Sequence, residues 1–445
     1  MTQLSHIQNE NHVTRVCLTT VVYISACLFL VGLGKRHVWG PGELGAVEVA
    51  KTMASSDDLC VSCPNDRSFL ERTPFFYWIV AAIFRCGGES TFWARLPAAL
   101  AAISTVTLLF AMARYQGYSN LQAVATGLVL ATSYGYFRSG RECCPDMVVC
   151  LFTAAALLSF RQTCHWGSGR AGWYSVFVLS LSAAFLTGGR IGPVAVVASL
   201  AGWVLLQKPL RLRGSAVLLS GCILAFVPVG IWMWFGSPHS TGNWIHGVSR
   251  LPVAWLLVGN HAQHSGGFYH YGSRILIGSL PWSLLLPWTV TYRVRRLRSG
   301  AHRESVLFAF LWLIVSLVVQ LVLADGRELH LLLTYPAAAL LIGTCLAEVL
   351  EKESEQDFWF RVSSKTLALL MIAAPIGLGV AYWYREGSVL GMSMLMPALC
   401  LGLWAYGRAS MGRWMHFYGI VVTSAMLLLL SYDRLVAVQL NQQAH

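Results

Sequence analysis

Long apolar stretches recur along almost the whole chain, and most of the connections between them are short and polar. Charged residues make up 12% of the 445 residues, about half the share of roughly 25% that is typical of soluble domains. These charges are too few to cover a soluble surface, so lipid must solvate the apolar stretches. Because backbone polar groups in lipid have to be paired internally, we expect an all-α polytopic membrane protein, with residues 1–445 forming one transmembrane domain.

The hydropathy of the sequence predicts about thirteen membrane-spanning helices. They cover residues 16–34, 93–113, 120–137, 146–160, 172–187, 190–206, 214–235, 273–292, 304–324, 329–349, 364–383, 388–406 and 413–432. No small-residue cleavage site follows the first, so we interpret it as a retained helix rather than a signal peptide. Residues 74–84 are apolar but too few to cross a bilayer, which is typical of an interfacial or re-entrant helix. The chain ends shortly after the last predicted span, so no soluble C-terminal domain is expected.

The distribution of Lys and Arg predicts the orientation of these spans. With the N-terminus in the cytoplasm, most basic residues of the short connections fall on the cytoplasmic side, including a dense group of five arginines between Arg293 and Arg303. We therefore expect a cytoplasmic N-terminus and an outer C-terminus. The same positions account for the formal net charge of +12, because basic residues beside spans meet anionic lipid headgroups. No nucleic-acid partner is expected.

Two connections, residues 35–92 and 236–272, are too long to be simple links, and both fall on the outer side. Long loops carry function more often than short ones. The outer connections also hold most of the acids and bases that could serve chemistry. Such residues belong at the bilayer edge, because a charge at its centre is costly. They could converge on one outward-facing cavity, and the alternative is a set of separately solvated loop charges.

Five of the 12 cysteines lie in connections predicted to be outside: Cys60, Cys63, Cys86, Cys143 and Cys144. An oxidising compartment would permit a disulfide among them, and the sequence does not select a pair. Cys60 and Cys63 are also spaced as half of a metal site, although no second such pair accompanies them. A divalent metal is therefore an open option, and no cofactor is certain.

Three blocks near the N-terminus resemble the first outer loop of a known superfamily. They are GELGAVEVAKTM from Gly42 to Met53, ERTPFFYW from Glu71 to Trp78, and FWARLPAALAA from Phe92 to Ala102. Together they resemble the aminoarabinose transferase and protein O-mannosyltransferase superfamily, whose members have the GT-C fold.

Further blocks continue this resemblance in the same order along the chain. They are RECCPDM from Arg141 to Met147, HSGGFYHYGSRILIGSLPWSLLLPW from His264 to Trp288, GRELHLLLTYPAAALL from Gly326 to Leu341 and, more loosely, LTGGRIGP from Leu186 to Pro193. The resemblance implies a GT-C bundle of about thirteen helices, with juxtamembrane helices in the first outer loop.

The resemblance also implies a function. The expected donor is a sugar linked to polyprenyl phosphate, and the acceptor is a lipid, a glycan or a protein. The expected place is the outer face of a bacterial inner membrane. No nucleotide-sugar site is expected, because the donor is already attached to lipid and no Walker-type or dinucleotide glycine motif is found.

Loss of the sugar leaves a lipid phosphate whose negative charge has to be held by cations. Arg72 matches a family lysine and is the first candidate, and Arg141, Arg274 and Arg327 are further candidates. Each of them could instead be an anchor at the membrane surface. The resemblance also suggests that Glu71 orients Arg72.

An acceptor hydroxyl has to be deprotonated, and a carboxylate suits that role. The family places an aspartate at the position that Gly42 occupies here. Glu43 and Asp146 are the remaining candidates, although Glu43 could be a structural cap and Asp146 could cap a span. His264 could bind the acceptor, a phosphate or a metal.

Gly45 and Ala46 replace a family arginine and a family tyrosine. Together with Gly42 they leave a second class of function open, a catalytically inactive relative that binds a polyprenyl lipid. A lipid or solute transporter is a third reading, which the grouping of charges at one membrane edge disfavours.

Overall fold

The computed structural model describes most of the chain, and every regular element in the described part is helical. The described residues are 2–38, 41–55, 75–164, 169–189, 191–207, 211–236, 268–296, 302–323, 328–352, 357–386 and 390–443. The helices of the first half are α1 (Thr2–Leu30), α2 (Pro41–Ser55), α3 (Phe75–Gly87), α4 (Thr91–Tyr115), α5 (Asn120–Ala131), α6 (Tyr134–Gly140), α7 (Pro145–Cys164), α8 (Arg170–Gly188), α9 (Ile191–Leu206) and α10 (Arg211–Gly236). Those of the second half are α13 (Phe268–Gly278), η2 (Trp282–Leu285), α14 (Leu286–Arg296), α15 (Arg303–Leu323), η3 (Glu328–Thr334), α16 (Tyr335–Glu351), α17 (Phe358–Glu386), α18 (Leu390–Ser410) and α19 (Trp414–Gln443).

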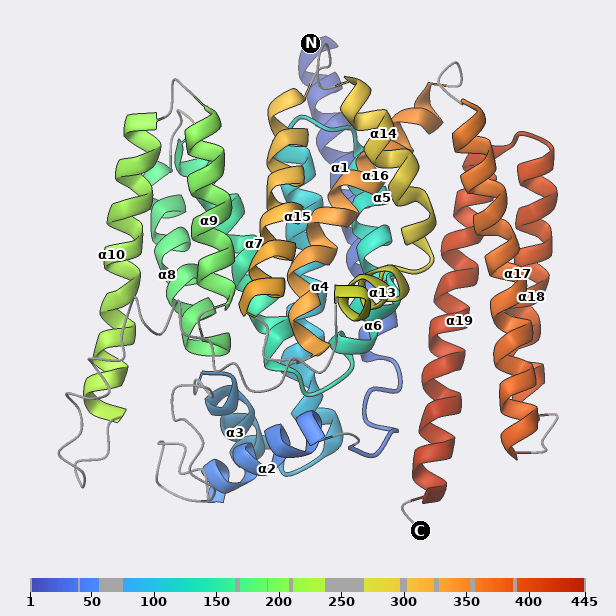
Figure 1. The fold of residues 1–445 in the computed structure, drawn as a ribbon, viewed down its shortest axis with the longest axis horizontal. Coiled ribbons are helices and arrows are strands. Elements are labelled where there is room, and N and C mark those ends of the chain that lie inside the picture. The colour runs from blue at the N-terminus through green and yellow to red at the C-terminus, as the bar shows by residue number, and fades with distance from the viewer. Residues whose placement is uncertain are drawn as a thin grey trace.

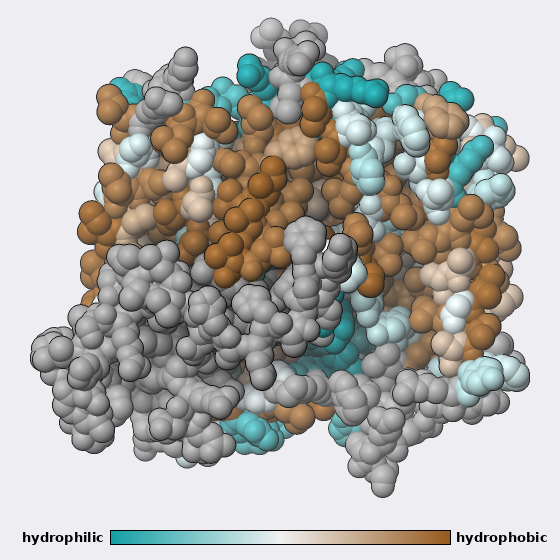
Figure 2. Space-filling model, viewed as in Figure 1, coloured by the Kyte–Doolittle hydropathy of each residue, from teal (hydrophilic) through white to brown (hydrophobic). Residues whose placement is uncertain are grey.

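The helices form an upright bundle with the two chain ends at opposite ends of it (Figure 1). Figure 2 shows a broad hydrophobic band across the middle, with hydrophilic residues along the upper edge and in a recess near the lower end. In the described part, nine helices are long and apolar enough to cross a membrane, or ten if one bent pair counts as a single span. The chain is thus an integral membrane protein. Each predicted span overlaps a helix, but the expected number of thirteen is not confirmed.

Two of the predicted spans are broken. The segment predicted at 120–137 divides into α5 and α6, since the hydroxyls of Thr132 and Ser133 bond back to carbonyls of α5 and thereby help to end it. The segment predicted at 273–292 is bent by 108° between α13 and the helix that begins at Trp282. Pro281 lies at this break, and a proline has no N–H with which to continue a helix.

Helix α16 forms the centre of the bundle. The apolar segment Leu331–Glu351 is 94% buried, whereas Leu212–Trp232 of the peripheral α10 is 28% buried. Helix α16 packs against α5, α14 and α15. Helices α17, α18 and α19 pack mainly against one another and form a separate group at the right of Figure 1.

Helices α2 and α3 lie across the lower end of the bundle, opposite the N-terminus (Figure 1). With 13 residues, α3 is about 20 Å long, too short to cross a bilayer. It buries Phe76, Val80 and Phe84, which share one face because of the helical repeat. The short helix predicted around residues 74–84 is therefore present, and it packs against α2 and α4.

Helices α5 and α16 approach so closely that Gly343 has no room for a side chain. A Cβ atom there would lie 2.5 Å from the backbone nitrogen of Thr126. Small residues allow such backbone contact between membrane helices. We expect Gly343→Ala to destabilise the protein by about 1–3 kcal/mol, because one of the two helices has to shift. Thermal unfolding in detergent measures this effect.

Gly407→Ala in α18 is the matched control, since a Cβ atom there meets nothing within 4 Å. Equal melting temperatures for the Gly343→Ala and Gly407→Ala variants would contradict the close contact between α5 and α16.

Candidate functional site

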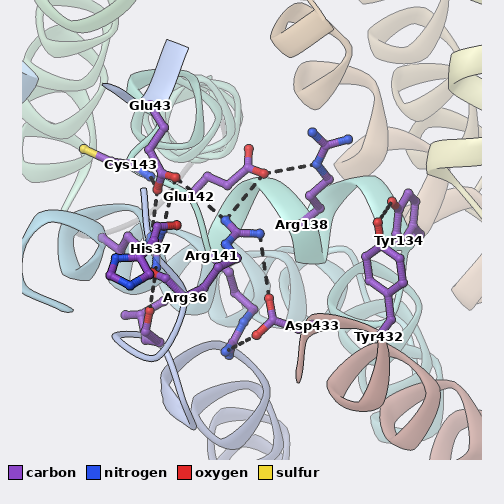
Figure 3. Close-up of polar contacts among 12 residues, drawn as sticks. Arg36, His37, Glu43, Tyr134, Arg138, Arg141, Glu142, Cys143, Tyr432 and Asp433 are labelled. Atoms are coloured by element: carbon purple, nitrogen blue, oxygen red, sulfur yellow. Dashed lines mark hydrogen bonds and ion pairs between the residues drawn. The ribbon is translucent and has the colours of Figure 1, made fainter. Parts of the chain in front are cut away.

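A cluster of charged side chains joins α2 to α4, α6 and α19 (Figure 3). Helix α2 lies at the lower end of the bundle in Figure 1. We call this cluster the polar cluster. It consists of Arg36, Glu43, Arg95, Arg138, Arg141, Glu142 and Asp433. Four arginines thus meet three carboxylates, and the cluster carries one positive charge in excess.

The shortest ion pair of the polar cluster joins α2 to α4. Glu43 lies in the first turn of α2 and Arg95 in the first turns of α4. The Arg95 Nε and Nη2 atoms donate to the two carboxylate oxygens of Glu43 at 2.7 Å and 3.1 Å. Only 1% of the Arg95 side chain and 4% of the Glu43 side chain are exposed. Such a two-pronged pair fixes both partners in orientation as well as position.

The Glu43 and Arg95 side chains also form hydrogen bonds with nearby backbone groups. Arg95 also donates to the carbonyl oxygens of Leu33, Arg36 and His37, which follow α1. Glu43 Oε1 additionally accepts a bond from the backbone N–H of Cys143 at 2.9 Å. The Glu43–Arg95 pair therefore ties α2, the end of α1 and the turn before α7 to the start of α4.

A second buried contact ties the C-terminal helix to this end of the bundle. Arg141 Nη2 lies 2.9 Å from Asp433 Oδ2 of α19. The same guanidinium donates to the carbonyl oxygens of Leu28 and Val31 near the end of α1. Only 3% of the Arg141 side chain is exposed, so Arg141 fixes the placement of α19 while keeping its charge inside the cluster.

Arg138 is the exposed member of the polar cluster. Its side chain is 48% exposed, and its Nε lies 3.1 Å from Glu142 Oε1. Arg36 Nη2 lies 3.7 Å from the same oxygen of Glu142. Arg138 can therefore meet a ligand from outside the cluster, whereas Arg95 and Arg141 are enclosed by protein.

Arg274 is half-buried on α13, which packs directly against α6, the helix that carries Arg138. The side chain of Tyr335, at the start of α16, leaves no room for a larger residue at one position on each helix. A Cβ atom added at Gly278 of α13 would lie 3.0 Å from the Tyr335 Cζ, and one added at Gly135 of α6 would lie 2.9 Å from it. These two glycines allow α6 and α13, and with them two arginine-bearing helices, to lie in contact.

Asp146 lies half-buried in the first turn of α7. No hydrogen bond or ion pair engages its carboxylate within the described part of the chain. The N-terminus of a helix favours a negative charge, and Asp146 lies in this position on α7. Glu43 differs, since both of its oxygens already accept bonds from Arg95.

The cysteines beside Asp146 are unsuited to nucleophilic chemistry. Burial, followed by the nearby Glu43 charge, raises the pKa of Cys143 to about 12. Burial also raises the pKa of Cys144 well above its usual value. Both thiols are therefore protonated at neutral pH. Cys86, Cys143 and Cys144 are free thiols in the structure.

Gly42 and Gly45 both border open space. A Cβ atom at either position meets nothing within 4 Å among the described residues. The family aspartate and arginine are thus missing from places where side chains would fit.

Several predicted residues lie outside the described residues: Glu71, Arg72, His264, Arg327, Cys60 and Cys63. Their roles stay predictions. Within the described residues no group of three or more His, Cys, Asp or Glu side chains is arranged to hold a metal ion.

Sequence reasoning did not single out Arg95 or Asp433. Both could have been noticed in the sequence, because Arg95 is a lone charge in the first half of the apolar helix α4 and Asp433 lies with Arg434 in the largely apolar helix α19. Such charges need a partner near the membrane, and the partners are Glu43 and Arg141.

The Glu43–Arg95 pair gives a direct prediction. We expect Glu43→Gln to lower stability by about 3–5 kcal/mol, because a buried guanidinium then loses its counter-charge. Glu48→Gln is the matched control, since Glu48 is exposed on the same helix, and it should change stability by less than about 0.5 kcal/mol. Thermal unfolding in detergent measures both. Similar values for the two variants would show that the pair does not anchor α2.

The known proteins that this chain resembles are described as glycosyltransferases. The family described as dolichyl-phosphate-mannose-protein mannosyltransferase matches residues 71–234. The undecaprenyl phosphate-alpha-4-amino-4-deoxy-L-arabinose arabinosyl transferase of Edwardsiella ictaluri is 27% identical over 60% of this chain and 49% of its own length. The enzyme of the same name from Aeromonas hydrophila is 25% identical over 74% of this chain and 60% of its own length. The chain thus spans about half to three fifths of these two relatives.

Solved structures show the same fold over nearly the whole chain. The crystal structure of ArnT from Cupriavidus metallidurans bound to undecaprenyl phosphate has a TM-score of 0.72 at 18% identity, covering 95% of this chain and 76% of that one. The apo structure of the same protein has a TM-score of 0.73 at 20% identity, covering 94% and 76%. The chain therefore has the fold of these ArnT structures, which agrees with the GT-C fold that the motifs lead us to expect.

Proposed function

We propose that the chain is a membrane glycosyltransferase that moves a sugar from a polyprenyl-phosphate carrier to a lipid, glycan or protein acceptor. The observation that carries this proposal is the position of the polar cluster, which has excess positive charge and lies beside the first loop in a GT-C fold. The ArnT structure of the same fold is titled as bound to undecaprenyl phosphate. A positively charged site of this kind suits the same class of donor.

The leaving phosphate needs cations that a ligand can reach. Arg138 is half exposed and Arg274 lies on the neighbouring α13, so these two are the best-placed candidates among the described residues. Arg141 acts on the phosphate through its charge and not through a hydrogen bond, because its donors are directed to Asp433 and to two carbonyl oxygens. Arg72 and Arg327 complete the proposed set on the basis of the sequence.

The acceptor side needs a carboxylate only if the acceptor is a hydroxyl. Asp146 suits this role better than Glu43, because Glu43 is held by Arg95 while Asp146 has no such partner within the described ranges. In this proposal Glu43 holds the first loop in place and Asp146 accepts the proton. We place Glu71 and His264 on the acceptor side from sequence alone.

We further propose that the N-terminus is cytoplasmic and that transfer takes place on the outer face of a bacterial inner membrane. The polar cluster includes Glu43 of α2, and α2 lies at the end of the bundle opposite the N-terminus (Figure 1). The bias of Lys and Arg in the short connections supports this orientation.

An inactive lipid-binding relative is the second candidate. The open space beside Gly42 favours it, because the family carboxylate is missing where it would fit. Mass spectrometry of lipids and surface glycans, from cells with and without the protein, separates the two. A sugar that is missing from cells without the protein supports transfer and identifies donor and acceptor, whereas unchanged glycans together with retained carrier binding would favour the inactive relative.

Arg72 gives the first functional prediction. We expect Arg72→Ala to abolish sugar transfer by weakening donor binding, and Arg72→Lys to retain part of both, because lysine keeps the charge but not the two-pronged geometry. Transfer assays and titration with polyprenyl phosphate measure these effects. Arg67→Ala, in the same loop, is the control. Unchanged donor affinity in Arg72→Ala would remove Arg72 from the site.

Gly42 gives the second functional prediction. We expect Gly42→Asp to raise the rate of transfer by about tenfold or more if the acceptor is a hydroxyl, because a second base enters the open space. Gly42→Asn has nearly the same shape without the charge and should leave the rate unchanged. Activity that appears only in Gly42→Asp would show that the native chain is not an enzyme.

A further inference from the structure

Four arginines are buried among the described residues: Arg95, Arg141, Arg161 and Arg293. Three of them have a carboxylate oxygen within 3 Å, namely Arg95 with Glu43, Arg141 with Asp433, and Arg293 with Glu348. Arg161 is the exception, since no carboxylate lies within 4 Å of it in the described part of the chain.

Arg161 is nevertheless 5% exposed, and its Nη1 atom is fully buried with no hydrogen-bond acceptor. Its guanidinium carbon lies 4.7 Å from the centre of the Phe308 ring and 5.6 Å from that of Trp203. Aromatic faces attract a cation, but they do not neutralise it. Glu304 on α15 acts on Arg161 only from beyond ion-pair distance. A buried charge without a contacting counter-charge is costly, so the site calls for an anion.

The Tyr118 hydroxyl also interacts electrostatically with Arg161, while two tryptophans that pack against Phe308 add buried donors. The indole nitrogen of Trp203, in the ring that faces Arg161, is buried without an acceptor. The same holds for the indole nitrogen of Trp312, one helical turn beyond Phe308 on α15. Buried donors are normally paired. A guanidinium N–H and two indole N–H groups that all lack an acceptor suit an acceptor-rich, negatively charged ligand better than a neutral one.

This place is remote from the polar cluster. Arg161 lies in the last turn of α7, whereas Asp146 lies in the first turn. The 15 intervening steps correspond to about 22 Å along the helix. Arg161 therefore lies close to the opposite membrane surface, at the depth of lipid headgroups. The end of α14 and the start of α15 lie at the same end of the bundle (Figure 1). They carry Arg295, Arg296 and Arg303, and such basic residues attract anionic lipids.

We propose that α7, α9 and α15 form a phosphate-binding site around Arg161, Trp203 and Trp312, separate from the transfer site. The phosphate comes from a lipid headgroup or from solution. Its oxygens accept bonds from the Arg161 Nη1 and from the indole N–H groups. The bound anion neutralises Arg161 and joins the three helices.

The test uses the purified, delipidated full chain in neutral detergent. Inorganic phosphate is titrated against sodium chloride of equal ionic strength, and phosphatidylglycerol is added in a separate series. Melting temperature is measured in both series, and native mass spectrometry measures retained lipid. We expect a saturable rise in melting temperature with phosphatidylglycerol, with inorganic phosphate, or with both. Stabilisation by the lipid alone identifies a headgroup, and stabilisation by inorganic phosphate as well identifies the phosphate group itself.

Two variants localise the effect. We expect Arg161→Gln to weaken binding by about tenfold or more, because a charge-assisted bond is lost. Trp203→Phe removes one donor while keeping the ring, and it should weaken binding to a smaller extent. Arg170→Gln is the control, since Arg170 is exposed at the start of α8, close to the end of α7, and it should bind as the native chain does.

The proposal fails if neither probe stabilises the native chain beyond the sodium chloride control. It also fails if Arg161→Gln and Trp203→Phe bind as tightly as Arg170→Gln. If Arg161→Gln does not fold, the Trp203→Phe result alone decides, because that substitution leaves the charge and the aromatic contact in place.

Discussion

The ion pair between Glu43 and Arg95 holds the first loop against the helix bundle. Both side chains are almost completely buried at the membrane edge, where an unpaired charge is costly. Arg95 uses its remaining donors on the chain that follows α1, and Glu43 uses one oxygen on the turn before α7. Three segments far apart in the sequence therefore meet at one contact. The polar cluster exists because this contact places α2 at the end of the bundle.

The same arrangement explains a division of roles within the cluster. Arg95 and Arg141 are enclosed and pair with Glu43 and Asp433, so they build the site. Arg138 is half exposed, so a ligand can reach it from outside the cluster. Arg274, on the adjacent α13, is proposed to act beside it. The enclosed arginines still contribute to the excess of positive charge. A lipid phosphate leaving a sugar would encounter that charge in a medium of low dielectric constant, where its effect is largest.

The sequence predicted the helical class, the short helix around residues 74–84 and the fold shared with ArnT, because apolar periodicity and motif spacing are local properties. It did not predict the breaks in the spans, since Thr132, Ser133 and Pro281 interrupt segments of continuous apolar character. Nor did it pair Arg141 with Asp433, which are 292 residues apart. Contacts of that kind depend on how helices pack. The motifs identified Glu43 and Asp146 as candidates. Only the structure showed that Glu43 is paired with Arg95, whereas Asp146 has no such partner among the described residues.

The central claim is that the end of the bundle beneath the first loop releases a sugar from a lipid phosphate. The most direct measurement is the release of polyprenyl phosphate from a polyprenyl-phosphate sugar in liposomes that contain the purified chain and a candidate acceptor. We expect release to require the chain and the acceptor. With a hydroxyl acceptor, release should slow strongly when Asp146 is replaced by asparagine while the melting temperature stays unchanged. Tight binding of the carrier with no release, from every donor that the cells supply, would contradict the claim.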